Sequence, residues 1–281
     1  MRVRRRTGLA AGAVVVVVAI AVGVVLFLTR SHDDQPSAHC MLLHPTAAPA
    51  AGDTSRVVVV DQGYTRLPSS TTLVSMGAVL QNTTGKVAYR TRVRFDVLNP
   101  AGSSVVWANQ KSFMTQEVPI ILPGTKIAVG DALTLTETAR QDAGAVARIS
   151  ITVTVSQWLA PGKGNEGLGP ITTTTNAGAS TRHSDGSGSV AYTTDNTNCA
   201  RMVGRGSSMI FRNESGAIVG GSLSTQPALL ACQPGQSSSP DTAIATLRSI
   251  PTSADLGKTL LTAYCDLDRP QPSDDPDVPV N

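Results

Sequence analysis

The chain opens with an uninterrupted uncharged segment from Thr7 to Thr29, whose centre is the valine run Val14–Val18. A helix of this length, rising about 1.5 Å per residue, crosses the roughly 30 Å hydrocarbon core of a bilayer. We therefore expect a transmembrane helix over residues 7–29. A cleaved signal peptide is the alternative, but its apolar core is shorter, about 7–15 residues, and ends at small residues. Here the segment ends in Phe27-Leu28-Thr29-Arg30.

From residue 56 onward the hydrophobic positions follow the period of β-strands. Apolar and polar residues alternate through residues 89–97, 133–136 and 149–156, and residues 57–60 form a short apolar run. Such alternation in β-branched residues is typical of half-buried antiparallel strands. Turn-forming residues separate the segments, at 82–85, 99–102 and 123–124. Because no segment after residue 30 shows sustained helical periodicity, the pattern predicts an all-β fold of the sandwich type.

Composition divides the remaining chain into folded and unfolded parts. A stalk rich in Pro, Ala and His is predicted over residues 30–55, and a Gly/Ser/Thr-rich linker over 160–186. The proline-rich, acidic tail at 268–281 has the composition of a disordered segment. Two β domains are therefore expected, one over residues 56–159 and one over 187–267.

The two predicted domains share a pattern of landmarks. Asn82 and Asn99 are 17 residues apart, as are Asn196 and Asn213. In both domains the second asparagine is followed by a glycine three residues later, by an apolar pair and then by a Pro-Gly dipeptide. This ordered correspondence predicts that the second domain is a copy of the first.

The landmarks of the first domain resemble those of the FxLYD-type domains of prokaryotic surface proteins. They are residues 77–84, the strand ending in Phe95-Asp96-Val97-Leu98-Asn99, Gly102, Val105-Val106 and Leu122-Pro123-Gly124. The resemblance covers residues 56–158 and, in part, 187–267. It implies two tandem Ig-like β-sandwich domains, tethered to a membrane and without known catalysis. Since these residues form turns, they indicate fold more than function.

Charge predicts how the chain is oriented. Four arginines precede the apolar segment and only Arg30 follows it closely, so residues 1–6 are expected in the cytoplasm and the rest outside the membrane. The formal charge of +3 includes five basic residues and no acids in residues 1–30, which leaves 18 basic and 20 acidic residues, or −2, beyond them. That balance argues against nucleic-acid binding. The excess of arginine over lysine is typical of high-GC, actinobacterial genomes.

Four cysteines lie beyond the predicted membrane segment, where disulfides persist. They are Cys40, Cys199, Cys232 and Cys265. An even number fits one or two disulfides with three complete pairings open. The positions of the last three in the repeat favour a bridge among them. Cys40 then either folds back onto this domain or joins another chain.

The stalk contains the residues with the most metal-binding chemistry. His39, Cys40, Met41 and His44 combine imidazole, thiolate and thioether, a set that suits copper or zinc. A metal-handling envelope protein is therefore an alternative function. We favour the other interpretation, a stalk with solvated histidines and a disulfide-bonded Cys40, and predict no resident cofactor.

Arg90, Arg92 and Arg94 alternate with apolar residues and are expected on one face of a strand. This arginine stripe is a candidate surface for an anionic envelope polymer or a partner protein. The alternative is a solvated outer face whose charges discourage the pairing of sheet edges.

Catalytic patterns are missing from the sequence: it contains no HExxH, GxSxG, SxxK or CxxC motif. Of the four histidines, three lie in the predicted stalk and His183 in the predicted linker. Neither predicted sandwich would then contain a histidine base. We therefore expect a non-catalytic binding ectodomain in the cell envelope, attached to the cytoplasmic membrane by the N-terminal helix.

Overall fold

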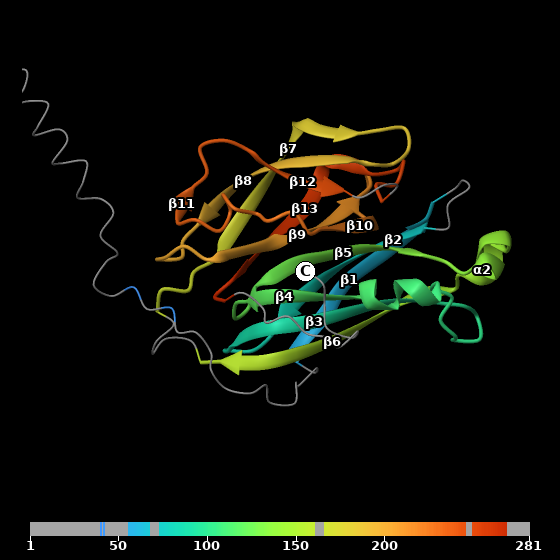
Figure 1. Cartoon of the computed structure of the whole chain (residues 1–281), viewed down its shortest axis with the longest axis horizontal. Coiled ribbons are helices and arrows are strands. Elements are labelled where there is room, and N and C mark those ends of the chain that lie inside the picture. Colours follow the sequence, from blue (N-terminus) through green and yellow to red (C-terminus); the bar gives the residue numbers. More distant parts are fainter. Residues whose placement is uncertain are drawn as a thin grey trace, which may run out of the picture. The chain divides into compact units, whose positions relative to one another are not determined.

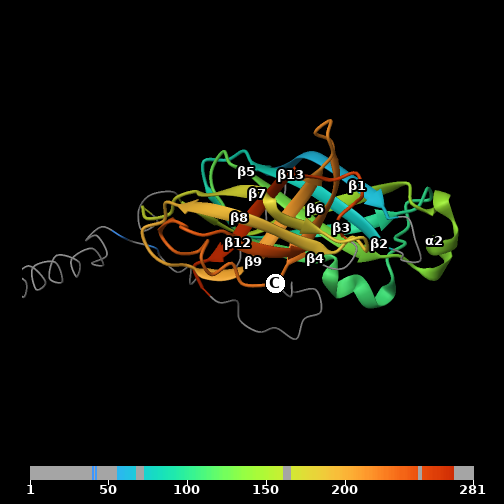
Figure 2. The same cartoon turned by 90° about the horizontal axis from the view of Figure 1, so that it is seen from above.

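The chain beyond the stalk consists mostly of β-strands, as the alternating pattern predicts. The computed structural model describes Cys40, Leu42 and residues 56–67, 73–160, 166–245 and 249–268. Its helical elements are short and lie in connections of the first half. They are the 3-10 helices η2 (Ala108–Phe113) and η3 (Ala143–Ala145) and the α-helix α2 (Glu137–Gln141), which lies at one end of the first half (Figures 1 and 2).

The first half is a β-sandwich of two antiparallel three-stranded sheets. One sheet has the order β1-β2-β5 and the other β4-β3-β6. The core between them contains Met76, Phe95 and Leu133, all fully buried. The strands are β1 (Val57–Arg66), β2 (Leu73–Asn82), β3 (Val87–Leu98), β4 (Thr115–Ile121), β5 (Lys126–Thr134) and β6 (Arg148–Leu159).

The second half repeats this arrangement. One sheet has the order β10-β9-β13, and in the other β8 pairs with β7, β11 and β12. β7 to β10 match β1 to β4 in chain order and pairing, β12 matches β5 and β13 matches β6. The strands are β7 (Ile171–Arg182), β8 (Gly188–Asn196), β9 (Val203–Arg212), β10 (Ile218–Ser224), β11 (Gly235–Gln236), β12 (Asp241–Ala245) and β13 (Asp255–Asp266).

The landmark asparagines occupy equivalent turns in the two halves. The side-chain amide of Asn82 donates to the carbonyl of Ile121, and that of Asn196 donates to the carbonyl of Ala231. In both turns the amide oxygen accepts a hydrogen bond from the backbone N–H two residues later. The repeated spacing therefore corresponds to a repeated structure.

The segment expected as a linker, residues 160–186, contains the 12-residue strand β7. Its threonines are β-branched and favour extended backbone. Composition alone does not distinguish such a threonine-rich strand from a flexible linker. They alternate along the strand: Thr173 and Thr175 turn inward and donate to carbonyl groups of β13, whereas Thr172 and Thr174 are exposed. The second sandwich thus begins before residue 187, and His183 lies in its β7–β8 turn.

The two sandwiches pack against each other through their inner sheets, β1-β2-β5 and β10-β9-β13 (Figure 1). All residues described from Cys40 to Asp268 belong to one compact unit. β2 is consequently covered on both faces, and residues 74–80 are buried without interruption. Even-numbered residues such as Met76 face the core of the first half, while Ser75 and Gly77 face the second half.

Glycines permit the close approach of the inner sheets. A Cβ atom added to Gly130 would collide with the carbonyl oxygen of Met209 and with the backbone of Gly221. One added to Gly77 would meet the carbonyl oxygen of Gly220. Because backbone cannot yield as a flexible side chain does, only glycine fits at these positions.

Hydroxyl groups of the second half satisfy the free edge of β5. The N–H of Ala128 donates to Thr262 Oγ1 at 2.9 Å, and the N–H of Gly130 donates to Ser208 Oγ at 2.6 Å. An edge strand otherwise presents unpaired backbone groups to other chains. The contact between the halves therefore also protects this edge.

The expected membrane helix at residues 7–29 lies outside the described residues, as do most of the stalk and residues 269–281 of the tail. Within the part of the chain that the structure describes, no helix has the length and apolar character needed to cross a membrane.

Replacing Gly130 by valine should destabilise the protein by more than about 3 kcal/mol, because the new side chain overlaps backbone that belongs to the other sandwich. Gly85→Ala is the matched control, since no atom lies within 4 Å of a Cβ added at Gly85. The measurement is the free energy of unfolding in denaturant. Equal stability of the two variants would contradict this account of the contact.

Candidate functional site

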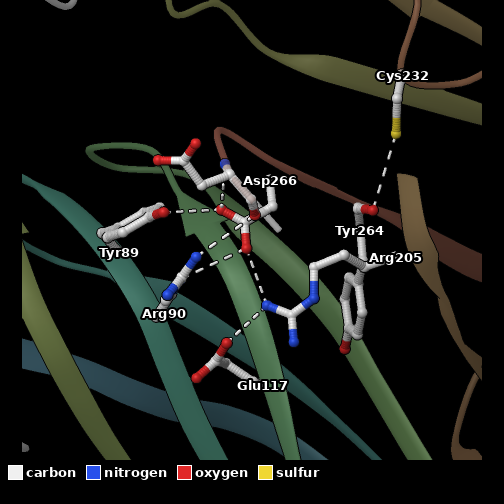
Figure 3. A network of polar contacts seen from close by, with 8 residues as sticks. Tyr89, Arg90, Glu117, Arg205, Cys232, Tyr264 and Asp266 are labelled. Atoms are coloured by element: carbon white, nitrogen blue, oxygen red, sulfur yellow. Dashed lines mark hydrogen bonds and ion pairs between the residues drawn. The ribbon is translucent and has the colours of Figure 1, made fainter. Parts of the chain in front are cut away.

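A buried cluster of charged groups joins the two halves. Asp266, at the end of β13, is fully buried, and its carboxylate accepts hydrogen bonds from Tyr89 Oη at 2.8 Å and Arg205 Nη1 at 2.9 Å. Arg90 Nε lies 3.4 Å from the same carboxylate. Figure 3 shows these three side chains converging on Asp266 from β3 and β9.

Glu117 of β4 completes the cluster. Its carboxylate accepts a hydrogen bond from Arg205 at 2.6 Å, so Arg205 bridges Glu117 and Asp266 (Figure 3). Two cations, Arg90 and Arg205, thus balance two anions. Burying ions costs desolvation energy that only well-placed partners offset. The cluster therefore favours one relative placement of the two halves.

Tyr264 of β13 extends from the second half into the core of the first half. Its ring is fully buried there, and its hydroxyl donates to Gln116 Oε1 at 2.6 Å. Gln116 in turn donates to the carbonyl of Gly130 at 3.0 Å. Burial raises the pKa of Tyr264 far above its ordinary value, so the hydroxyl stays protonated and remains a donor.

Asp131 of β5 is a buried carboxylate without a charged partner among the described residues. Its Oδ1 accepts from the N–H of Ala132 at 2.7 Å, whereas its Oδ2 has no hydrogen-bond partner in the described structure. Burial raises the pKa of Asp131 from 3.8 to about 7, and the hydrogen bond from Ala132 opposes this change only in part.

Two disulfides resolve the pairing that the sequence left open. Cys232 is bonded to Cys265 within the second half, and Cys40 folds back to Cys199, which lies after β8. The expected bridge among the last three cysteines is therefore present, and Cys40 bonds within its own chain.

The disulfide at Cys40 weakens the metal hypothesis. A disulfide sulfur is no longer the thiolate ligand that copper or zinc would require. His39 and His44 lie outside the described residues. Over the range that is described, no group of three or more His, Cys, Asp or Glu residues is placed to hold a metal ion.

The arginine stripe divides into an internal and an external part. Arg90 forms an ion pair with Asp266 and lies over the ring of Tyr89. Arg92 is half-buried, and Arg94 is exposed. Arg90 therefore belongs to the cluster between the halves, which leaves Arg92 and Arg94 as the outward part of the stripe.

A groove runs along the junction of the two halves beside the charge cluster. Its deeper end is a pocket of about 170 Å³ lined by both halves and by Cys265. A shallower extension of about 730 Å³ continues past Lys126 along β7 and β13. The apolar residues of the deeper end include Ile120, Leu122, Ile127, Leu168, Ile171 and Met202.

Sequence reasoning missed Asp131, Glu117, Arg205 and Asp266. A faint signal existed for two of them: Asp131 interrupts an apolar strand, and Arg205 stands between two glycines in a run of small residues. A charged residue in such a run indicates a buried partner. The partners come from distant strands, so no spacing in the sequence identifies them.

No family model matches this chain, and comparisons with curated proteins and with solved structures found no similar protein. The FxLYD resemblance therefore stays a prediction. The charge cluster consists of mutually neutralised groups and supplies adhesion between the halves, whereas the groove has space for a ligand. The groove is the candidate site.

Replacing Arg205 by methionine should lower the free energy of unfolding by about 3–5 kcal/mol, because two buried carboxylates lose their common partner. Arg148→Met, at an exposed position of β6, should cost less than about 0.5 kcal/mol. Denaturant unfolding at pH 7 measures both. A cost below about 1 kcal/mol for Arg205→Met would show that the cluster is not a principal contact.

Asp131 should make the protein less stable as pH rises. The folded state holds this proton more tightly than the unfolded state, so stability is unaffected below about pH 4 and falls between about pH 4 and 7. The loss is on the order of 4 kcal/mol. Asp131→Asn, which stays neutral, should be more stable than the original protein at pH 8 and similar at pH 4. Thermal unfolding across this range checks it, with Asp195→Asn on the outer face of β8 as control.

Proposed function

We propose that this protein is a membrane-anchored, extracytoplasmic binding protein that performs no chemistry. Its ectodomain holds a ligand groove between two Ig-like sandwiches. The N-terminal helix attaches it to the cytoplasmic membrane, and nucleic acid is not a partner.

One observation carries the proposal: the disulfide between Cys40 and Cys199. Cys40 lies ten residues after Arg30, where the predicted membrane segment ends. The bond ties the chain that leaves the predicted anchor to the second sandwich. Disulfides of this kind persist in oxidising compartments and are rare in the cytosol, which supports an ectodomain outside the membrane.

The strand pairing supports the Ig-like assignment. In Ig-like sandwiches, strands A, B and E share one sheet, and strand C pairs with F and, in the variable type, with C′. β1-β2-β5 and β4-β3-β6 match those two sets in chain order. The same correspondence holds in the second half, where β7-β8-β12 and β10-β9-β13 take these places.

The groove supports binding as the activity. Its walls come from both sandwiches, whose relative position is held by the charge cluster and by the glycine contact. Preformed pockets at the junction of two structural units are common ligand sites.

The topology is tested in the source cells with a tag at the C-terminus. We expect the full-length chain in the membrane fraction after an alkaline carbonate wash. A maleimide carrying polyethylene glycol should add no mass before reduction and four labels after reduction and unfolding, since all four cysteines are paired.

Two outcomes would overturn the proposal. One is full-length protein in the cytosol with its thiols labelled before reduction. The other is protein in the culture fluid that lacks the apolar segment, which would identify a secreted protein with a cleaved signal. Cys199→Ser serves as control, because it frees Cys40 alone and should expose one thiol without reduction.

A further inference from the structure

The deeper end of the groove is an apolar pocket of the size of a small hydrocarbon group. Its volume is about 170 Å³, and a cavity of about 150 Å³ lined by aliphatic residues accepts benzene. Leucine, isoleucine and methionine side chains from both halves line it, together with Ala263 and Cys265. Such walls favour an apolar ligand segment through the hydrophobic effect.

The uncharged polar side chains at this end already form hydrogen bonds within the protein. Thr262 Oγ1 accepts from Ala128 N–H, and Thr125 Oγ1 donates to the carbonyl of Leu122 at 2.8 Å. Asn198 accepts from Gly169 N–H at 2.9 Å and donates to the neighbouring Asn196. These groups hold the walls in place and offer little to a polar ligand.

Lys126 lines both the pocket and its extension. It is exposed at the start of β5, and among the described residues it has no ion-pair partner. The other charged residues of the extension are paired: Arg212 binds Asp61 at 2.9 Å, and Lys258 lies 4.0 Å from Asp255. An ammonium group that has no ion-pair partner in the described structure therefore lies where the apolar pocket meets the wider groove.

From this juxtaposition we propose that the groove binds a single-chain anionic amphiphile, with its hydrocarbon end in the pocket and its carboxylate or phosphate beside Lys126. This inference rests on the proposed binding function and names its ligand class. The positive charge of Lys126 favours an anionic group at the polar end of the ligand. The polar groups of the pocket wall already have hydrogen-bond partners, so the pocket itself favours hydrocarbon. A ligand with two acyl chains would exceed the volume of the pocket, about 170 Å³.

Photo-crosslinking of the full-length chain tests the proposal. The probe is decanoic acid with a diazirine near its methyl end, added below its micelle concentration to whichever cell fraction contains the protein. We expect adducts within residues 119–127, 168–172, 198–202 and 262–265. Excess decanoate should suppress them at least tenfold, decanol less, and decylamine least.

Variants of the protein test the contacts of the two ends of the ligand separately. Ala263→Phe fills the pocket, and Thr172→Trp obstructs it from an exposed position where the fold is not at risk. Both should reduce labelling at least tenfold. Lys126→Glu should weaken labelling by the decanoate probe about tenfold but leave labelling by the matching decanol probe unchanged. Lys111→Glu, in η2 and outside the groove, should label like the original protein.

Competition identifies the source of the ligand. Suppression by lysophosphatidylglycerol as well as decanoate indicates that the site accepts a membrane lipid, and suppression by decanoate alone indicates a free fatty acid; both agree with the proposal. Adducts confined to other segments, or labelling of Ala263→Phe and Thr172→Trp as strong as that of the original protein, would overturn it. Because labelling does not depend on where the cell places the protein, its failure is distinguishable from failure of the proposed topology.

Discussion

The structure depends on the close contact between the inner sheets of its two sandwiches. Backbone meets backbone at Gly77, Gly130 and Gly221. Such proximity would bury backbone N–H groups at the edge of β5 without hydrogen-bond partners, but the hydroxyls of Ser208 and Thr262 accept hydrogen bonds from them. Inside the contact, the hydroxyl of Ser75 accepts a hydrogen bond from the N–H of Gly221 and donates one to its carbonyl. Small residues and hydroxyls together make this interface possible, and the buried charge cluster aligns it.

The interface joins different faces of the two copies. The first half contributes its β1-β2-β5 sheet, whereas the second contributes β10-β9-β13, the counterpart of β4-β3-β6. A contact of this head-to-tail kind does not close on itself and can propagate into longer arrays. The outer sheets differ from the inner ones in ways that oppose the addition of further molecules. β3 presents Arg92 and Arg94 there, and β7 presents exposed threonines. Arg92 and Arg94, the outward part of the arginine stripe, are comparable with the polar outer faces of terminal repeats.

Sequence periodicity predicted the fold class and the longest strands, because alternation along residues 89–97 and 149–156 reflects one buried face per strand. It did not predict the joining of the halves. β2 and β9 are buried on both faces, and their inner faces mix Ser and Gly with Val79 and Ile210, so no regular alternation marks them in the sequence. β7 was missed for a related reason: its threonines have strand propensity, but the composition is also that of a linker. The charge cluster escaped prediction because Tyr89, Glu117, Arg205 and Asp266 meet only through tertiary packing.

The predicted stalk and the groove contribute residues to the same hydrophobic cluster. Leu42, two residues after the disulfide-bonded Cys40, packs on the cluster that contains Leu122, Leu168 and Cys265, which also line the pocket. The segment that follows the predicted anchor is therefore attached beside the apolar pocket, through the disulfide at Cys40 and the packing of Leu42.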